Sequence, residues 1–324
     1  MATFGEASTG RGLYEIAVTA LPLVALWTTL CISLQAGYWI ALPLVLPAAG
    51  FLVRLFIIQH DCGHGSFFPH KTLNDWTGRI LGVLTFTPYD WWKRTHALHH
   101  ASSGNLARRG IGDVDTLTVE EYLALPKMRR LAYRIYRNPF VLFVLGPSYL
   151  FLLQHRLPVG LMGRDWKPWA SAMATNLGIL LLAVAMVWLF GLKTLLFVHL
   201  PIVVLAGTFG VWLFYVQHQF EHTVWAQEPE WDRHGAALHG SSYYDLPEPL
   251  QWITGYIGIH HVHHLCSKIP FYRLPTVLKA YPQLREISRL SVTESLKCVR
   301  LALWDEKRKR LIGFSDLSRP STGA

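Results

Sequence analysis

Short clusters of histidine are the candidate metal ligands of this sequence. In chain order they are His60 and His64, then His96, His99 and His100, then His218 and His222, and finally His260, His263 and His264. Positions three or four apart share one face of a helix, so an H-x-x-H-H cluster can direct two imidazoles to one metal ion and the third to a neighbouring ion. The clusters therefore predict a metal site, provided that the fold brings them together.

Eight to ten imidazoles are too many for a single ion, because zinc takes four ligands, or three and a water molecule. Two ions with four or five nitrogen ligands each would match the number. Imidazole accepts Zn, Cu, Fe or Ni, so the ligand type alone does not choose the metal. We leave out His261, because on a helix it faces away from the other histidines of its cluster. We expect the isolated histidines to be core or surface residues: His70, His155, His199, His234 and His239.

The composition indicates how these clusters are positioned. Hydrophobic residues make up 51% of the 324 residues and charged residues only 16%, whereas soluble domains carry about 25% charged residues. Four apolar stretches of about 20 residues or more, near 13–34, 38–58, 169–190 and 192–216, are long enough to cross a bilayer. The short breaks around Gly37 and Gly191 predict two antiparallel hairpins. The fold class expected is therefore an all-α membrane protein.

The distribution of basic residues predicts the topology. The hairpin tips contain a single basic residue, Lys193, so the positive-inside rule places both termini and the central segment in the cytoplasm, with the protein multi-pass in the cell inner membrane. The expected architecture is one domain over 1–324, with a helical cytosolic cap formed by 59–168 and 217–324. Two shorter apolar stretches, 79–87 and 140–153, are expected to be re-entrant or interfacial helices, or else ordinary core helices.

The net charge of +9 has the same explanation. We attribute it to topology and to contact with anionic lipid headgroups rather than to nucleic-acid binding, for which there is no motif. The basic run 307–310 is expected to face solvent or headgroups, or alternatively to dock an acidic redox partner.

The clusters and their surroundings resemble the membrane fatty acid desaturase family, whose members carry three histidine boxes. The first cluster, His60-Asp61-Cys62-Gly63-His64, looks like the first box of bacterial acyl-lipid desaturases of Δ12/ω6-like type. The likeness covers roughly residues 35–280 and extends beyond the boxes to the stretches 108–113, 116–122, 136–139, 215–221 and 240–247.

The resemblance implies four spans, a cytosolic cap that holds two iron ions, and a narrow acyl-chain tunnel beneath them. The family's ligand positions correspond to the eight histidines of the three boxes, and the segment after the fourth span supplies one more ligand. His218 fits that position best, but His222 stands where bacterial relatives carry Asp, so both are candidates.

The chemistry implied is desaturation. A side-chain base cannot break an unactivated methylene C–H bond. This requirement favours iron over zinc, because an iron centre can use O2 to oxidise the substrate. The expected product is a cis double bond in an acyl-lipid substrate. Asp61, Glu221 and Asp245 are candidate carboxylates that orient ligand N–H groups, or else salt-bridge partners in the cap.

The electrons are expected from a separate donor such as ferredoxin or flavodoxin. The sequence contains no cytochrome b5 haem signature and no dinucleotide-binding motif. Its four cysteines, Cys31, Cys62, Cys266 and Cys298, form no C-x-x-C pair and no iron–sulfur set.

Three other functions fit parts of the pattern. A related membrane di-iron hydroxylase or carotenoid ketolase would use similar boxes to insert oxygen, and lipid products would distinguish it from a desaturase. A metal-dependent membrane hydrolase would act without O2. A metal transporter would need polar residues through its spans, which the apolar run 177–190 does not provide.

Overall fold

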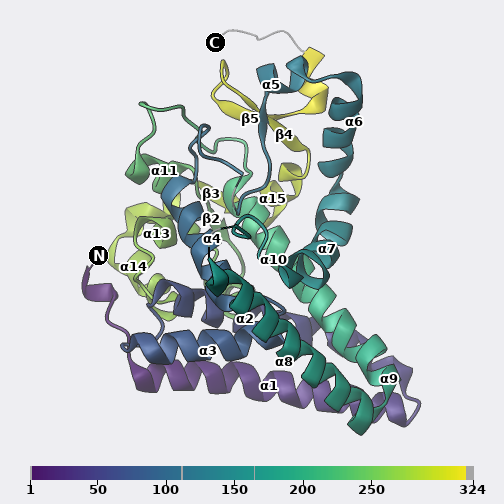
Figure 1. Cartoon of the computed structure of the whole chain (residues 1–324). Helices are drawn as coiled ribbons and strands as arrows, with labels where there is room; N and C mark the ends of the chain where they lie inside the picture. Colours follow the sequence, from purple (N-terminus) through teal and green to yellow (C-terminus); the bar gives the residue numbers. More distant parts are fainter. Residues whose placement is uncertain (1, 111, 164, 319–324) are drawn as a thin grey trace.

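Four long apolar helices dominate the computed structural model, which describes residues 2–110, 112–163 and 165–318 (Figure 1). The helical stretches Thr9–Gln35, Trp39–His64, Trp166–Phe190 and Leu192–His218 are long and apolar enough to cross a membrane. They coincide with the four predicted stretches to within about six residues at each end. Outside the described residues lie Met1, Ile111, Arg164 and residues 319–324, which belong to segments predicted to form the cap or the termini.

Two of these stretches contain more than one helix type. Helix α2 (Val45–His64) follows the 3₁₀ helix η2 (Trp39–Leu44), and α10 (Leu200–His218) follows α9 (Leu192–Thr194) and the π-helical turn η5 (Leu195–His199). Helices α1 (Thr9–Gln35) and α8 (Trp166–Phe190) are continuous.

Local signals fix where these helices begin and end. The Ser8 hydroxyl accepts from the Arg11 N–H at the start of α1, and the Asp165 carboxylate accepts from the Lys167 N–H at the start of α8. Helix α2 stops at Gly65, whose φ of +64° favours glycine and allows its N–H to reach the carbonyls of the last turn. Gly191, with φ +81° and ψ 161°, separates α8 from α9, and its N–H donates to the Val187 carbonyl oxygen.

Helix α2 lies at the centre of the apolar bundle, with α1, α3 (Lys71–Leu84) and α10 packed against it. Its buried side chains include Leu52, Val53 and Ile58. The outer side of α8 instead exposes Leu181, Val184 and Trp188. An apolar surface of this kind is unfavourable in water and suits contact with lipid.

The two shorter apolar stretches lie against the long helices. The first, 79–87, is the second half of α3 and the following turn, and Gly178 of α8 gives Val83 room to approach closely. The second, 140–153, forms η3 (Val141–Leu145) and α7 (Gly146–Leu152), and Phe151 contacts α10 at Gly207. Helix α4 (Tyr89–Ser102) then follows α3, and η4 (Gln154–Arg156) follows α7.

The remaining elements lie on the side of the molecule away from α9 (Figure 1). The helical ones, with their bounds, are η1 (Ala2–Phe4), α5 (Val119–Ala124), α6 (Lys127–Tyr136), α11 (Arg233–His239), α12 (Glu248–Ile253), α13 (His260–Leu265), η6 (Phe271–Arg273), α14 (Leu274–Ala280), η7 (Pro282–Glu286), α15 (Val292–Cys298) and η8 (Phe314–Ser318).

The prediction that the fold is entirely α-helical is wrong in one respect, because this region also contains short strands. They are β1 (Leu117–Thr118), β2 (Tyr243–Asp245), β3 (Arg289–Ser291), β4 (Leu301–Asp305) and β5 (Arg310–Gly313). β1 pairs in parallel with β4, β4 pairs antiparallel with β5, and β2 pairs in parallel with β3. Strands this short show no reliable alternation in sequence, and partners far apart in the chain complete them.

A candidate metal centre of two histidine groups

The clustered histidines converge at the ends of four helices that lie far apart in sequence. One group contains His60, His64, His96, His100 and His263, and the second contains His99, His218, His260 and His264. Within each group, one nitrogen of every side chain lies within 4.8 Å of the others. The nine residues come from α2, α4, α10 and α13, so the site depends on how these four helices pack.

The two H-x-x-H-H clusters divide between the groups in complementary ways. On α4, His96 and His100 belong to the first group and His99 to the second. On α13, His260 and His264 belong to the second group and His263 to the first. The groups are adjacent, because the His100 and His264 rings stack with centroids 4.1 Å apart.

The spacing of the Nε2 atoms is that of a ligand cage. His96 Nε2 lies 3.1 Å from the Nε2 atoms of both His64 and His100. In the second group, His218 Nε2 lies 3.2 Å from His99 Nε2 and 3.0 Å from His260 Nε2. An imidazole nitrogen offers either one hydrogen or one lone pair, so it cannot make a good hydrogen bond to two such neighbours. Nitrogens bound about 2.1 Å from one ion at right angles would lie about 3.0 Å apart, which matches these distances.

Burial favours the neutral imidazole that a metal requires. Most of the nine side chains are buried, and Trp92 stacks on the ring of His96 with centroids 4.5 Å apart. Desolvation lowers the pKa well below its usual range at the grouped histidines that lie outside the long apolar helices and show a shift: His96, His100, His260, His263 and His264. These imidazoles are therefore neutral at neutral pH, and each has one ring nitrogen with a lone pair that can bind a cation.

Hydrogen bonds from Nδ1 orient three of the rings. His60 Nδ1 lies 3.0 Å from Asp61 Oδ1, and Asp61 Oδ2 also accepts from the Phe271 N–H at 2.6 Å. His99 Nδ1 lies 2.5 Å from Asp113 Oδ1. His218 Nδ1 lies 3.2 Å from the Gly240 carbonyl oxygen. When Nδ1 carries the proton, Nε2 presents its lone pair to the group.

The predicted cluster of His218 and His222 is divided, because the structure separates the two residues. Helix α10 ends at His218, and Gln219 leaves the helical conformation with φ −117° and ψ 63°. His222 is exposed and belongs to neither group, so the expectation of a helical i, i+4 pair is wrong.

Only one of the three candidate carboxylates lies at the site. Asp61 does, as described above. Glu221 is exposed and pairs with Arg310 at 2.8 Å, whereas Asp245 bonds to Tyr243 and Arg289. Neither Glu221 nor Asp245 hydrogen-bonds to a histidine in the described part of the chain. They are the salt-bridge partners that the sequence offered as the alternative.

Two partners of the histidines were not identified from the sequence. Asp113 and the Gly240 carbonyl both lie in stretches that carried the family resemblance, which is the signal that could have identified them. Asp113 lies in the loop that follows α4. The number of residues between His99 and Asp113 does not show that this loop turns back onto the helix.

The isolated histidines, among them the exposed His70 and His234, lie outside both groups. His261 is fully buried on α13, and its Nε2 donates to the Leu284 carbonyl oxygen at 2.9 Å. Its role in the described structure is to tie α13 to η7.

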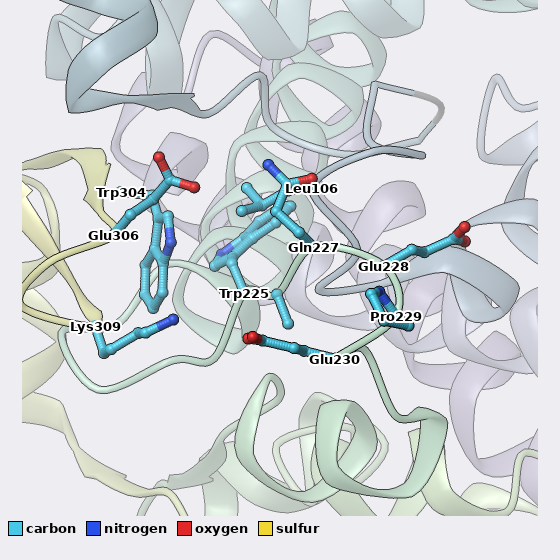
Figure 2. Close-up of a pocket in the computed structure, with 10 residues that line it drawn as sticks. Leu106, Trp225, Gln227, Glu228, Pro229, Glu230, Trp304, Glu306 and Lys309 are labelled. Carbon is cyan, nitrogen blue, oxygen red and sulfur yellow. The ribbon is translucent and has the colours of Figure 1, made fainter.

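A surface cavity of about 230 Å³ lies away from the histidines, between the segment around Trp225 and the β4–β5 hairpin (Figure 2). Trp225, Trp304, Glu230 and Lys309 are among the residues that line it, and none of the grouped histidines does. This cavity is therefore separate from the metal centre.

Long apolar helices and two converging histidine groups define a mostly helical protein whose clustered imidazoles could hold metal ions. The chain belongs to the fatty acid desaturase family, since the sequence pattern described as "Fatty acid desaturase" matches residues 36–294. A "Fatty acid desaturase" of Bacillus subtilis (strain 168) is 43% identical over 314 residues, which cover 97% of this chain and 89% of that protein.

Two relatives from Synechocystis sp. (strain ATCC 27184 / PCC 6803 / Kazusa) have more specific names. An "sn-1 acyl-lipid omega-3 desaturase (ferredoxin)" is 30% identical and covers 73% of this chain and 66% of that protein. An "sn-1 oleoyl-lipid 12-desaturase" is 27% identical and covers 76% of this chain and 73% of that protein. Members of the family are oxidoreductases, and the resemblance to the fatty acid desaturase family is confirmed.

Proposed function

We propose that this chain is an O2-dependent acyl-lipid desaturase that inserts a cis double bond through a di-iron centre. The observation that carries the proposal is the pair of adjacent histidine groups, linked by the stacked rings of His100 and His264. Five imidazoles in one group and four in the other suit two ions better than one.

The nine grouped histidines would hold the two ions, and His222 would not. Iron at these positions would supply the oxidising power that an unactivated methylene requires, with O2 and two external electrons. The balanced reaction is –CH2–CH2– + O2 + 2e⁻ + 2H⁺ → –CH=CH– + 2H2O.

The protein's own residues contribute position and shielding. Asp61 and Asp113 hold the Nδ1 protons of His60 and His99, so that each Nε2 keeps a fixed direction. Phe214 packs against the rings of His99 and His218, with centroids 5.2 and 5.1 Å away, and limits the access of water to the second group. A rigid, shielded site would hold one methylene pair within reach of the ions.

The same proposal includes a membrane arrangement. The four long apolar helices would cross the inner membrane as two hairpins, with both termini and the segments 59–168 and 217–324 on the cytoplasmic side. This places the histidine groups at the cytoplasmic ends of α2 and α10, next to the acyl chains of the bilayer. The positive-inside pattern of the sequence supports this orientation.

We propose a lipid-linked acyl chain as the substrate and a separate ferredoxin-like protein as the electron donor. Relatives from Synechocystis and Nostoc that carry "acyl-lipid" and "(ferredoxin)" in their names support both assignments. The names of the relatives include 12- and omega-3 desaturases, so we assign no double-bond position.

The test is fatty-acid profiling by double-bond position in a desaturase-deficient bacterial host that expresses the chain. We expect new unsaturated acyl chains in phospholipids, none without O2, and none from H99A despite normal membrane insertion. The matched control is H234A, which removes an exposed histidine outside both groups and should retain full activity. Hydroxylated or ketolated lipids, or turnover without O2, would overturn the proposal.

A further inference from the structure

Helix α6 exposes an apolar stripe that no described part of the chain covers. Met128, Leu131 and Ile135 are 75%, 51% and 54% exposed. They lie at positions i, i+3 and i+7, so they share one face of the helix. Large apolar side chains rarely line up in water unless another surface covers them.

The opposite side of α6 packs against the rest of the protein, and this packing determines which way the stripe points. Tyr133 is buried, and its hydroxyl donates to the Ala302 carbonyl oxygen at 2.6 Å and accepts from the Leu117 N–H at 3.1 Å. On a helix Tyr133 lies roughly opposite Met128 and Ile135. The stripe therefore points away from the β1–β4–β5 sheet.

Basic residues flank the stripe on both sides. Lys127 and Arg129 are exposed, while the Arg134 guanidinium lies 4.8 Å from the centre of the Phe314 ring and is also exposed. An apolar face bordered by cations is typical of helices that lie in the plane of a membrane surface, with their cations among anionic headgroups.

The stripe continues into the apolar surface beside α10. After α6 the chain exposes Phe140, Leu145 and Tyr149, and η3 and α7 pack along α10. Figure 1 shows α6 beyond α7, and Arg137 at the end of α6 donates to the hydroxyl of Tyr215 in the last turn of α10 at 3.4 Å. The helix therefore lies where a membrane crossed by α10 would have its surface.

The other basic run does not have these properties. In 307–310, Arg308 pairs with Asp305 at 3.5 Å and Arg310 with Glu221 at 2.8 Å. This run forms the β4–β5 turn, at the far side of the molecule from the long helices (Figure 1). Its Lys307 and Lys309 therefore provide a control surface of the same charge.

We propose that α6 is an in-plane membrane anchor that binds the headgroups of anionic phospholipids. Met128, Leu131 and Ile135 insert into the boundary between headgroups and acyl chains, and Lys127 and Arg129 contact the phosphates. The inference rests on the membrane arrangement proposed above, but it concerns neither the histidine groups nor turnover.

The first test measures depth on the full chain in lipid nanodiscs. A spin label at Leu131→Cys is compared with labels at Val184→Cys, on the exposed side of α8, and at Lys307→Cys. The signal of the labelled parent chain, which has a half-buried Cys266, is subtracted. We expect positions 131 and 184 to collide more with O2 than with a water-soluble nickel chelate, and position 307 to show the reverse. A water-exposed label at 131 would overturn the proposal.

The second test measures headgroup selectivity with spin-labelled phosphatidylglycerol and phosphatidylcholine. Removing the two cations in K127Q/R129Q should lower the affinity of the α6 site for phosphatidylglycerol by about fivefold per cation. The matched control, K307Q/K309Q, should leave it unchanged. Equal effects of the two double variants on lipid affinity would contradict the proposal. Spin–spin broadening of the label at position 131, seen only in nanodiscs that hold two chains, would also contradict it, because the stripe would then contact a second copy of the chain. Iron content and desaturation should stay normal in K127Q/R129Q, so failure here is distinguishable from failure of the proposed function.

Discussion

Arg54 and Glu15 form an ion pair buried between two apolar helices. The distance from Arg54 Nη2 to Glu15 Oε2 is 2.6 Å, and the two side chains are 1% and 2% exposed. Arg54 also donates to the Thr19 hydroxyl at 3.1 Å and to the Trp252 carbonyl, and it lies 4.1 Å from the centre of the Trp252 ring. This network joins α1 and α2 to α12 and so ties the apolar bundle to the histidine-bearing region.

Glu15→Gln should lower the free energy of unfolding by about 3–5 kcal/mol, because it leaves the buried Arg54 charge without its counterion. Replacing both partners in E15Q/R54M should restore much of the loss, since no buried unpaired charge remains and Arg11, the other partner of Glu15, is exposed. Thermal unfolding of the purified protein in detergent measures both. The control is D90N, which breaks the half-exposed Arg79–Asp90 pair and should cost about 1 kcal/mol or less. If E15Q/R54M were as unstable as E15Q, the unpaired Arg54 charge would not be the cause of the lost stability.

Asp113→Ala should weaken metal binding about 10- to 100-fold, because His99 then loses the carboxylate that fixes its Nδ1 proton. Asp113→Asn keeps an oxygen acceptor and should have a smaller effect. The measurement is iron bound per chain as a function of free Fe²⁺. The control is D115N, which changes a neighbouring carboxylate on the same loop. Normal iron affinity in D113A would remove Asp113 from a positioning role.

His218→Ala should lose about half of the bound iron, since His218 belongs to the group of four, whereas His222→Ala should retain all of it. Elemental analysis of the purified variants, together with acyl-chain profiling, distinguishes the two. The reverse result would mean that the segment after α10 rearranges when metal binds.

Removal of iron with a chelator should lower the melting temperature. The two groups join four helices from distant parts of the sequence, so each bound ion stabilises the folded state by about 2.7 kcal/mol when the free ion is at 100 times its Kd. Scanning calorimetry with and without Fe²⁺ measures the shift. H260A/H264A, which lacks half of the second group, should show a smaller shift. An equal melting temperature in both states would contradict the arrangement of the groups.

Sequence alone determined the long apolar helices, the helical spacing of the three boxes and the family. Runs of about 20 apolar residues and i, i+3, i+4 spacing are local properties, so they can be recognised without knowledge of tertiary contacts. His60 and His64 on α2, and His96 to His100 on α4, lie on helices as their spacing predicted.

Tertiary structure decided which residues meet. Helix α10 ends at His218 and so excludes His222, Asp113 returns to His99 through a loop, and Glu15 finds Arg54 across two helices. Strand pairs such as β1–β4 also join residues more than 180 positions apart. These contacts depend on where helices end and how they pack, which involves long-range burial and hydrogen bonding that no short stretch of sequence encodes.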